Sequence, residues 1–362
     1  MISADEAAPY DRPNISKDYL AGNAPEEWIP LRPSDWYEKT RVELITNHRV
    51  VKLAPDDRSV TLDDGRRLEY GALMLATGAS PIRLDVPGAQ LPHVHYLRTL
   101  HDSRTIIQRA KQARRAVVVG ASFIGLEAAA ALRARNVEVH IVAPDETPLQ
   151  RVLGVELGRF VREVHEQHGV RFHLGQTVAS IAEHSVSLKN GTKLDADLVV
   201  VGIGVRANTD LAEQAGLRID HGVVVDEYFC TSTTGIWAGG DIARWPDRYS
   251  GSTIRVEHWV VAERHGQSVA RNMLGRHEPF TAAPFFWSMH YDMAIAYVGF
   301  AQEWESVKVV GSIPDRDCLV AYRKNGKTLA VASVNRDIDS LRVQVAMDRG
   351  DVAAVEAIVQ GR

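Results

Sequence analysis

Residues 115–127 read RAVVVGASFIGLE, and this stretch decides the fold. The apolar run before Gly120 predicts a buried strand, and the alanine-rich segment after Gly125 predicts a helix. A strand that turns into a helix through a G-x-G-x-x-G pattern is the usual context of a dinucleotide site. Because apolar runs and helical patterns continue to alternate up to residue 223, the region predicts a parallel sheet with crossover helices.

The turn itself supplies the first candidate binding residues. Its first glycine permits a tight turn, its last lets the helix approach the strand, and the free N–H groups at the helix start can hold a pyrophosphate. Ser122 replaces the middle glycine, which narrows the approach of a phosphate. We expect nucleotide contacts at five positions: Gly120, Ser122, Phe123, Ile124 and Gly125.

The end of the next predicted strand should decide which nicotinamide nucleotide binds. An acid at this position bonds the ribose 2′-OH of NAD. The position is occupied by Ala143, whereas Asp145 is the nearest acid and Arg151 follows downstream. The sequence therefore does not separate NADH from NADPH, and we write NAD(P)H.

Composition excludes several classes of protein. The 362 residues are too many for one small module, and 42 Lys and Arg against 46 Asp and Glu leave a net charge of −4. Without basic blocks, this charge argues against a nucleic-acid partner. No apolar run approaches the roughly 18 residues of a spanning helix, and the acidic N-terminus is unlike a signal peptide. We therefore expect a cytoplasmic protein with no membrane segment.

Cysteines and histidines offer no redox or metal motif. Cys230 and Cys318 are too far apart for a CxxC pair and too few for a disulfide scaffold. His165 and His168 do not have the HExxH spacing of a zinc hydrolase, and we expect both on a solvated helix face. We predict no metal ligands in this chain.

Eight motifs follow one another as in a single flavoprotein family. The chain resembles the FAD-dependent NAD(P)H reductases of the pyridine nucleotide-disulfide oxidoreductase superfamily, above all the ferredoxin reductases of oxygenase systems and the apoptosis-inducing-factor-like flavoproteins. The resemblance spans most of the chain. The motifs are PYDRPNISKDYL (9–20), EEWIPLR (26–32), ATGASP (76–81), GASFIGLE (120–127), GIGVRAN (202–208), AGGDIA (238–243), EHW (257–259) and FFWS (285–288).

This resemblance implies an α/β fold with two Rossmann-like nucleotide-binding domains, the first truncated at its N-terminus, and a C-terminal α+β domain. We assign residues 1–98 and 224–283 to a discontinuous FAD-binding domain, 99–223 to an NAD(P)-binding domain and 284–362 to a C-terminal interface domain. It also implies electron transfer from NAD(P)H through FAD to an iron–sulfur acceptor of the ferredoxin or Rieske type. A homodimer is left open.

The resemblance assigns catalytic roles to two residues. Lys17 would point at flavin N5, where an ammonium stabilises the electron-rich reduced ring, and Glu127 would fix the position of that lysine. In the same N-terminal segment, Arg12 would neutralise an FAD phosphate and Pro13 would pack against the flavin ring. Residues 10–20 contain no cysteine, so the disulfide-reductase and peroxidase-type relatives are excluded.

Further cofactor-binding residues follow from the other motifs. Gly240 and Asp241 match the second FAD signature, in which the aspartate accepts hydrogen bonds from the ribityl chain. The helix start at Glu257, His258 and Trp259 would stabilise negative charge at the flavin N1–C2 edge, although a plain helix N-terminus is an alternative for Glu257. Trp287 would add an aromatic wall to the flavin site. Three residues of the glycine-rich motifs complete the set: Thr77, Gly78 and Gly204.

One expected unit of the family is not recognisable. Relatives begin with a βαβ unit whose G-x-G-x-x-G holds the FAD pyrophosphate, whereas residues 1–6, MISADE, resemble the tail of that unit's second strand. We therefore expect a truncated gene start of a working flavoenzyme. The alternative is a non-catalytic remnant that binds NAD(P) but does not retain FAD.

Overall fold

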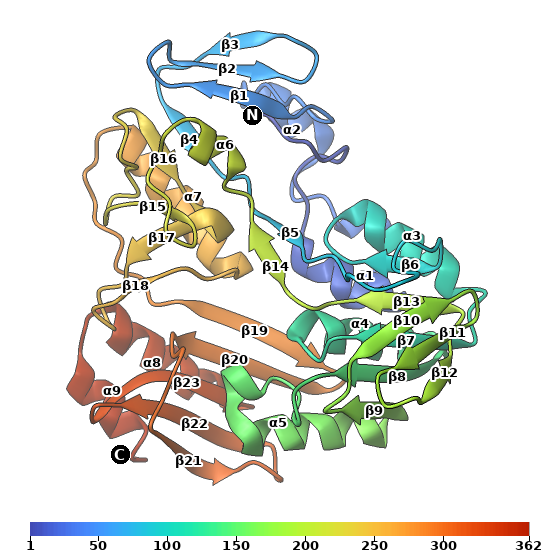
Figure 1. The fold of residues 1–362 in the computed structure, drawn as a ribbon. Helices are drawn as coiled ribbons and strands as arrows, with labels where there is room; N and C mark the ends of the chain where they lie inside the picture. Colours follow the sequence, from blue (N-terminus) through green and yellow to red (C-terminus); the bar gives the residue numbers. More distant parts are fainter. Residues whose placement is uncertain (362) are drawn as a thin grey trace.

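The computed structural model describes residues 1–361. Figure 1 shows three parts: two nucleotide-binding-type domains, and a C-terminal domain built on one antiparallel sheet. This arrangement confirms the fold class expected from the sequence. No helix within the described residues is both long enough and apolar enough to cross a bilayer.

The central domain is built on a five-stranded parallel sheet. Its strand order is β6 (Val94–Tyr96), β13 (Leu198–Val201), β7 (Arg115–Val119), β8 (Glu138–Ala143) and β9 (Val170–Leu174). Alternate residues of β7 face opposite sides because side chains alternate along a strand. Ala116 and Val118 pack in the core that includes helix α4 (Phe123–Ala134), and Val117 and Val119 pack under a small antiparallel sheet.

The remaining elements of this domain cover both faces. The helices are α3 (Leu100–Ala110) and α5 (Gln150–Gln167), in addition to α4. The small antiparallel sheet comprises β10 (Val178–Ala182), β11 (Ser185–Leu188) and β12 (Lys193–Asp195).

The other nucleotide-binding-type domain combines residues that precede the central domain in the sequence with residues that follow it. An antiparallel meander forms as β1 (Val50–Ala54), β2 (Ser59–Leu62) and β3 (Arg67–Glu69). The strand after the meander is β4 (Leu73–Leu75), which pairs in parallel with β16 (Ile236–Ala238). The other sheet contains β15 (Val223–Val224), β17 (Ala243–Pro246) and β18 (Thr253–Ile254).

Short helices and connecting strands complete this domain. They are η1 (Arg12–Ser16), α1 (Asp18–Ala21), η2 (Glu26–Trp28), α2 (Ser34–Lys39), α6 (Asp210–Gln214), η3 (Gly240–Ile242) and α7 (Trp259–Met273). Strands β5 (Ala79–Pro81) and β14 (Val205–Ala207) run antiparallel where the chain passes between the two domains.

The C-terminal domain packs helices on one face of its sheet. Its strand order is β19 (Phe285–His290), β20 (Met293–Gly299), β23 (Lys327–Val334), β22 (Asp317–Lys324) and β21 (Ser306–Ser312). Helices α8 (Asp337–Asp348) and α9 (Val352–Ile358) cover one face, whereas the other face shares a core with α4 and α5. The sheet is therefore anchored to the central domain.

The expectation of a solvated face for His165 is wrong. Its side chain is fully buried, and Nε2 lies 3.1 Å from Nδ1 of His290, which β19 contributes. Only His168 is exposed, and its ring stacks on Tyr291. The segment forms the expected helix, α5. Which of its positions are buried is decided by the packing of the C-terminal sheet on α5, a contact between segments distant in sequence.

Burial makes these histidines sensitive to acid. Desolvation lowers the pKa of His165 well below its ordinary value and that of His290 to about 3. At a pH between about 3, the pKa of His290 in the folded protein, and 6.5, its pKa in the unfolded chain, the unfolded chain binds more protons than the folded protein. The contribution of these neutral histidines to the free energy of unfolding should therefore be complete above pH 6.5. It should fall as the pH decreases toward 3.

His290→Gln should reduce this acid sensitivity. Lowering the pH from 7.5 to 5.5 should lower the free energy of unfolding of the wild type by about 1 kcal/mol through His290 alone, a loss that the variant lacks. Urea denaturation at the two pH values measures the difference. An equal loss in both proteins would contradict the assignment of a neutral, buried His290.

Candidate functional site

A buried carboxylate lies where the three domains meet. Glu127 is 4% exposed and belongs to the first half of α4. Its Oε2 lies 3.0 Å from Nζ of Lys17 and accepts a hydrogen bond of 2.6 Å from the Ser16 hydroxyl. Its Oε1 accepts a hydrogen bond of 2.7 Å from the Ser288 hydroxyl of β19. Each oxygen of the carboxylate therefore has a donor, and the donors come from the N-terminal segment and the C-terminal domain.

The N-terminal segment is shaped to present Lys17. Pro13 sits in the first turn of η1, where its missing N–H costs no helical hydrogen bond. Lys17 occupies the junction between η1 and α1, and its ammonium also lies 3.4 Å from the carbonyl oxygen of Pro13. The Lys17 side chain remains 16% exposed, so its charge is held by Glu127 without being fully enclosed. The pair expected from the resemblance is thus formed in the structure.

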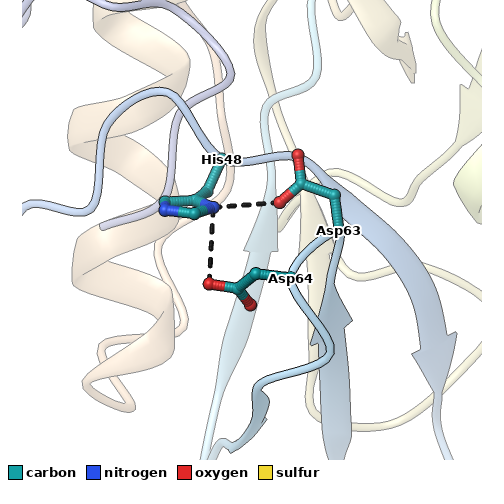
Figure 2. Close-up of side chains that lie close together, drawn as sticks. All are labelled: His48, Asp63 and Asp64. Atoms are coloured by element: carbon teal, nitrogen blue, oxygen red, sulfur yellow. Dashed lines mark hydrogen bonds and ion pairs between the residues drawn. The ribbon is translucent and has the colours of Figure 1, made fainter.

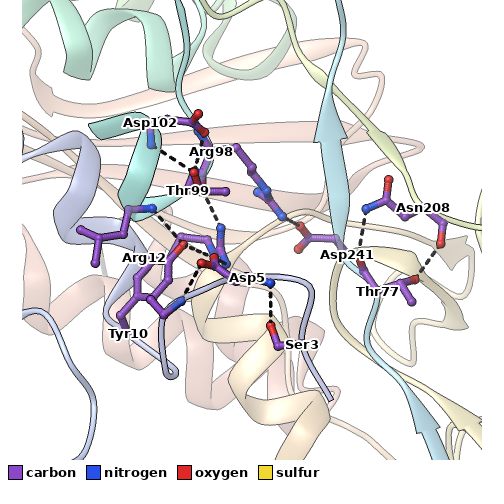
Figure 3. Close-up of polar contacts among 12 residues, drawn as sticks. Ser3, Asp5, Tyr10, Arg12, Thr77, Arg98, Thr99, Asp102, Asn208 and Asp241 are labelled. Carbon is purple, nitrogen blue, oxygen red and sulfur yellow. Dashed lines mark hydrogen bonds and ion pairs between the residues drawn. The ribbon is translucent and has the colours of Figure 1, made fainter. Parts of the chain in front are cut away.

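A second cluster surrounds Asp241 (Figure 3). The carboxylate of Asp241 pairs with the Arg98 guanidinium at 2.6 Å, and the Arg12 guanidinium donates to the Arg98 carbonyl oxygen. Arg12 also lies 3.8 Å from Asp5, which accepts a hydrogen bond of 2.8 Å from the Tyr10 hydroxyl. Two predicted cofactor residues, far apart in sequence, are therefore connected through Arg98.

Arg98 was not among the sequence candidates. It follows β6 and lies just before α3, which begins with a capping box formed by Thr99 and Asp102. Asp102 also accepts a hydrogen bond of 3.0 Å from the Arg98 backbone N–H. The capping pattern T-x-x-D could have indicated an ordered helix start at this position, but the pairing with Asp241 is a tertiary contact that no local pattern reveals.

Thr77 and Gly78 lie beside Asp241 because they follow a neighbouring parallel strand. β4 and β16 pair in parallel, so the residues after their carboxyl ends emerge at the same edge of the sheet. The Thr77 hydroxyl donates to the Asn208 carbonyl oxygen at 2.6 Å, and the Asn208 amide donates to the Thr77 carbonyl oxygen at 2.8 Å (Figure 3). Gly78 has φ of +68°, which favours glycine.

The predicted nucleotide turn lies at the corresponding edge of the central sheet. A Cβ on Gly120 would lie 2.3 Å from the Gly202 carbonyl oxygen, and a Cβ on Gly125 would lie 2.2 Å from the Gly120 carbonyl oxygen. Both glycines are therefore required by close backbone contacts. Gly204, with φ of +109°, follows β13 at the same edge.

Ser122 has a structural role at this turn. Its hydroxyl donates to the Gly202 carbonyl oxygen at 2.8 Å and accepts from the Gly125 N–H at 3.3 Å, which caps α4. Phe123 packs edge-on against Phe286 of β19, whereas Ile124 is 41% exposed. Of the five predicted positions, Ile124 presents the most accessible side chain and Ser122 is occupied by internal hydrogen bonds.

The start of α7 lies near the Asp241 cluster. Glu257 pairs with Arg255 at 2.6 Å, and the same guanidinium donates to the Asp241 carbonyl oxygen at 2.9 Å. His258 is the N-cap residue of α7, and its ring stacks on Phe286. Desolvation lowers the pKa of His258 to about 4, so this ring is neutral near pH 7. Its neighbour Trp259 opens the helix and is half-buried.

Trp287 is separated from the residues that contact Glu127. Neighbouring side chains of β19 point to opposite faces, so Phe286 and Ser288 are buried while Trp287 is 38% exposed. The structure therefore places Trp287 on the side of β19 opposite to Ser288. Ser288, which the sequence motif contained without a role, is the residue of β19 that contacts Glu127.

A separate polar cluster lies on the meander (Figure 2). His48 Nδ1 lies 2.9 Å from Asp63 and 3.6 Å from Asp64. Asp63 also accepts from the Arg49 N–H at 3.0 Å, and Asp64 pairs with Arg66 at 2.6 Å. The hydrogen bond from His48 lowers the pKa of Asp63. Because both carboxylates have donors within the chain, this cluster stabilises an exposed turn.

The Lys17–Glu127 pair and the Asp241 cluster together fit a flavin nucleotide. A partly exposed ammonium, a carboxylate and two guanidiniums come from Lys17, Asp241, Arg98 and Arg12, and the last three are joined by direct contacts. A Cβ on Gly78 would lie 3.5 Å from the Arg98 guanidinium, so this glycine lines the cluster directly. Cations suit phosphates, and carboxylates suit the hydroxyls of a ribityl chain.

Comparison with known proteins places this geometry in a family. Residues 1–266 match the model of the pyridine nucleotide-disulphide oxidoreductases, and residues 285–361 match a reductase C-terminal domain. The chain belongs to the pyridine nucleotide-disulphide oxidoreductase family. Members of this family use FAD and NAD(P)H, and the chain is an oxidoreductase of this kind.

Two relatives match nearly the whole chain. Rhodocoxin reductase of Rhodococcus erythropolis is 34% identical over 346 residues, which are 94% of this chain and 81% of that protein. Putidaredoxin reductase of Pseudomonas putida is 34% identical over 360 residues, 96% of this chain and 85% of the relative.

Solved structures show the same likeness. Putidaredoxin reductase in its covalent complex with putidaredoxin superposes with a TM-score of 0.93 at 31% identity and covers 99% of this chain and 91% of its own. A ferredoxin reductase from Rhodopseudomonas palustris has a TM-score of 0.93 at 35% identity, covering 99% and 90%.

Gly125→Ala should disrupt the nucleotide turn. The added methyl group would meet the Gly120 carbonyl oxygen, so we expect a loss of about 1–3 kcal/mol in the free energy of unfolding, with weaker NAD(P)H binding. Gly266→Ala in α7 is the matched control, because a Cβ there meets no neighbour and the change should be neutral or stabilising. Denaturation and nucleotide titration test this, and equal behaviour of the two variants would contradict it.

Proposed function

We propose that this chain passes electrons from NAD(P)H through FAD to an iron–sulfur protein of the ferredoxin type. The observation that carries the proposal is the Lys17–Glu127 pair, whose Nζ and Oε2 atoms lie 3.0 Å apart where the three domains meet. The names of its relatives support it, since rhodocoxin reductase, putidaredoxin reductase and the ferredoxin–NAD(+) reductase component of an anthranilate dioxygenase system are each 34% identical to this chain.

Lys17 supplies the positive charge at the reaction centre. When bound beside Lys17, FAD would supply an acceptor for a hydride that can release its electrons singly. The ammonium of Lys17 would donate a hydrogen bond at flavin N5 and stabilise the negative charge of the reduced ring. Glu127 holds the ammonium in place, and the hydroxyls of Ser16 and Ser288 hold Glu127. Because these partners are fixed by the N-terminal segment and by the C-terminal sheet, little reorganisation is needed when charge develops.

Arg12, Arg98 and Asp241 would bind the polar part of the flavin nucleotide. Asp241 would accept hydrogen bonds from ribityl hydroxyls with the oxygen that Arg98 does not occupy, and Arg12 would neutralise a phosphate. The bound FAD would pass close to the main chain at three positions: Thr77, Gly78 and Gly240. The first turn of α4 would hold the pyrophosphate of NAD(P)H, while Ala143 leaves the choice of NADH or NADPH open.

Three finer points belong to the same proposal. The acceptor includes the Rieske type as well as the plain ferredoxin type, and the chain forms a homodimer. The family's own FAD-binding G-x-G-x-x-G unit is, in this proposal, not encoded within residues 1–362. The two-stranded pair β4–β16 supports this last point, because a Rossmann-like domain normally extends such a pair with further parallel strands.

Two substitutions should separate binding from chemistry. Asp241→Ala should lower FAD retention roughly tenfold, because a charge-assisted partner of the nucleotide is lost. Lys17→Met should leave FAD bound but slow its reduction by NAD(P)H roughly 100-fold, because the ammonium acts on the reduced ring. Fluorescence titration with FAD and anaerobic stopped-flow absorbance measure the two effects.

A double variant controls for damage to the fold. Lys17→Met leaves Glu127 buried without its cation, whereas Lys17→Met combined with Glu127→Gln removes the buried charge as well. The double variant should be more stable than the single variant and equally slow in flavin reduction. If Asp241→Ala and Lys17→Met instead changed retention and reduction in parallel, the separate roles would be wrong.

A further inference from the structure

An apolar ridge with a charge at each end follows the outer side of α8. Ile338, Leu341 and Val345 are 68%, 58% and 47% exposed, although the opposite side of α8 is buried against the C-terminal sheet. A groove of about 390 Å³ runs between α8 and α9 beside these residues. Figure 1 shows both helices on the outer side of the C-terminal domain.

The order of residues along this ridge is symmetric. Asp337, Leu341, Val345 and Arg349 are spaced by four and are all exposed, so they form one ridge of the helix. Leu341 and Val345 lie two residues to either side of position 343, and Asp337 and Arg349 lie six to either side. Among residues 1–361, neither Asp337 nor Arg349 forms an ion pair through its side chain. The ridge thus has an apolar centre, an acidic end and a basic end.

We propose that the α8 ridge, residues 337–349, is the contact surface of a homodimer in which α8 packs antiparallel against α8 of a second copy. This inference rests on the proposed function in one respect, because it names the contact surface of the homodimer proposed there. A two-fold axis over position 343 places Leu341 against Val345 of the partner subunit. The same axis places Asp337 against Arg349 of the partner subunit, and the reverse pair forms at the other end. An isologous contact requires such self-complementarity.

The position of the ridge favours a second copy over an electron acceptor. α8 covers the face of the C-terminal sheet that carries Val298 and Val331, whereas Phe286 and Ser288 belong to the face that meets α4. The sheet therefore separates the ridge from the Lys17–Glu127 pair. Single-electron transfer favours a short path, so an acceptor docked on α8 would be poorly placed.

Charge reversal tests the pairing directly. Asp337→Arg and Arg349→Asp should each raise the dimer dissociation constant roughly tenfold or more, since like charges then face each other twice. The double variant Asp337→Arg/Arg349→Asp should restore the dimer, because the pairs are exchanged but remain complementary. An equimolar mixture of the two single variants should form a heterodimer, in which both end pairs are again opposite in charge. Sedimentation velocity over a wide concentration range measures all four.

The outcomes separate this inference from the proposed function. A wild-type chain that stays monomeric at every concentration, or single variants with the wild-type dissociation constant, would overturn the α8 dimer. Leu341→Glu is a further variant. If it kept the sedimentation mass of the wild type but had a raised KM for an iron–sulfur acceptor, the ridge would be the acceptor's docking surface, and the proposal would be overturned as well. FAD retention and flavin reduction should be unchanged in Asp337→Arg, so a failure of flavin chemistry in the wild type would count only against the proposed function.

Discussion

The hydrogen-bonded carboxylate of Glu127 determines how the three domains of this protein are held together. A buried carboxylate is costly unless it is paired, and Glu127 is 4% exposed. Its partners are Lys17 and Ser16 from the N-terminal segment and Ser288 from the C-terminal sheet, so satisfying one side chain requires all three parts to be in place. Removing the N-terminal segment or the C-terminal domain would leave the carboxylate with an unpaired oxygen.

The same helix connects the two cofactor sites. α4 begins at the glycine turn that suits a nicotinamide nucleotide, and Glu127 follows Gly125 by two residues. The position of Lys17 therefore depends on the helix that NAD(P)H would bind. This arrangement places the turn that would hold the hydride donor and the carboxylate that holds Lys17 on one rigid element, which supports transfer to the flavin without large rearrangement.

Much of the fold was predictable, and the misses have a common cause. The strand–glycine–helix pattern at 115–127 predicted the parallel sheet, because this signal is local. Arg98, Ser288 and the burial of His165 were missed because each depends on a contact between segments about 100 residues or more apart. The roles of Lys17 and Asp241 came from resemblance, since a lone lysine or aspartate carries no periodic signal.

An anaerobic absorption titration tests the central claim most directly. The 362-residue chain is mixed with excess FAD, separated from free flavin, and then titrated with NADH or NADPH. The account predicts bound-flavin absorption bands that bleach on addition of one nicotinamide nucleotide and return when an iron–sulfur acceptor is added. Binding of the nicotinamide nucleotide with no flavin uptake, or bound flavin that neither nucleotide reduces, would contradict it.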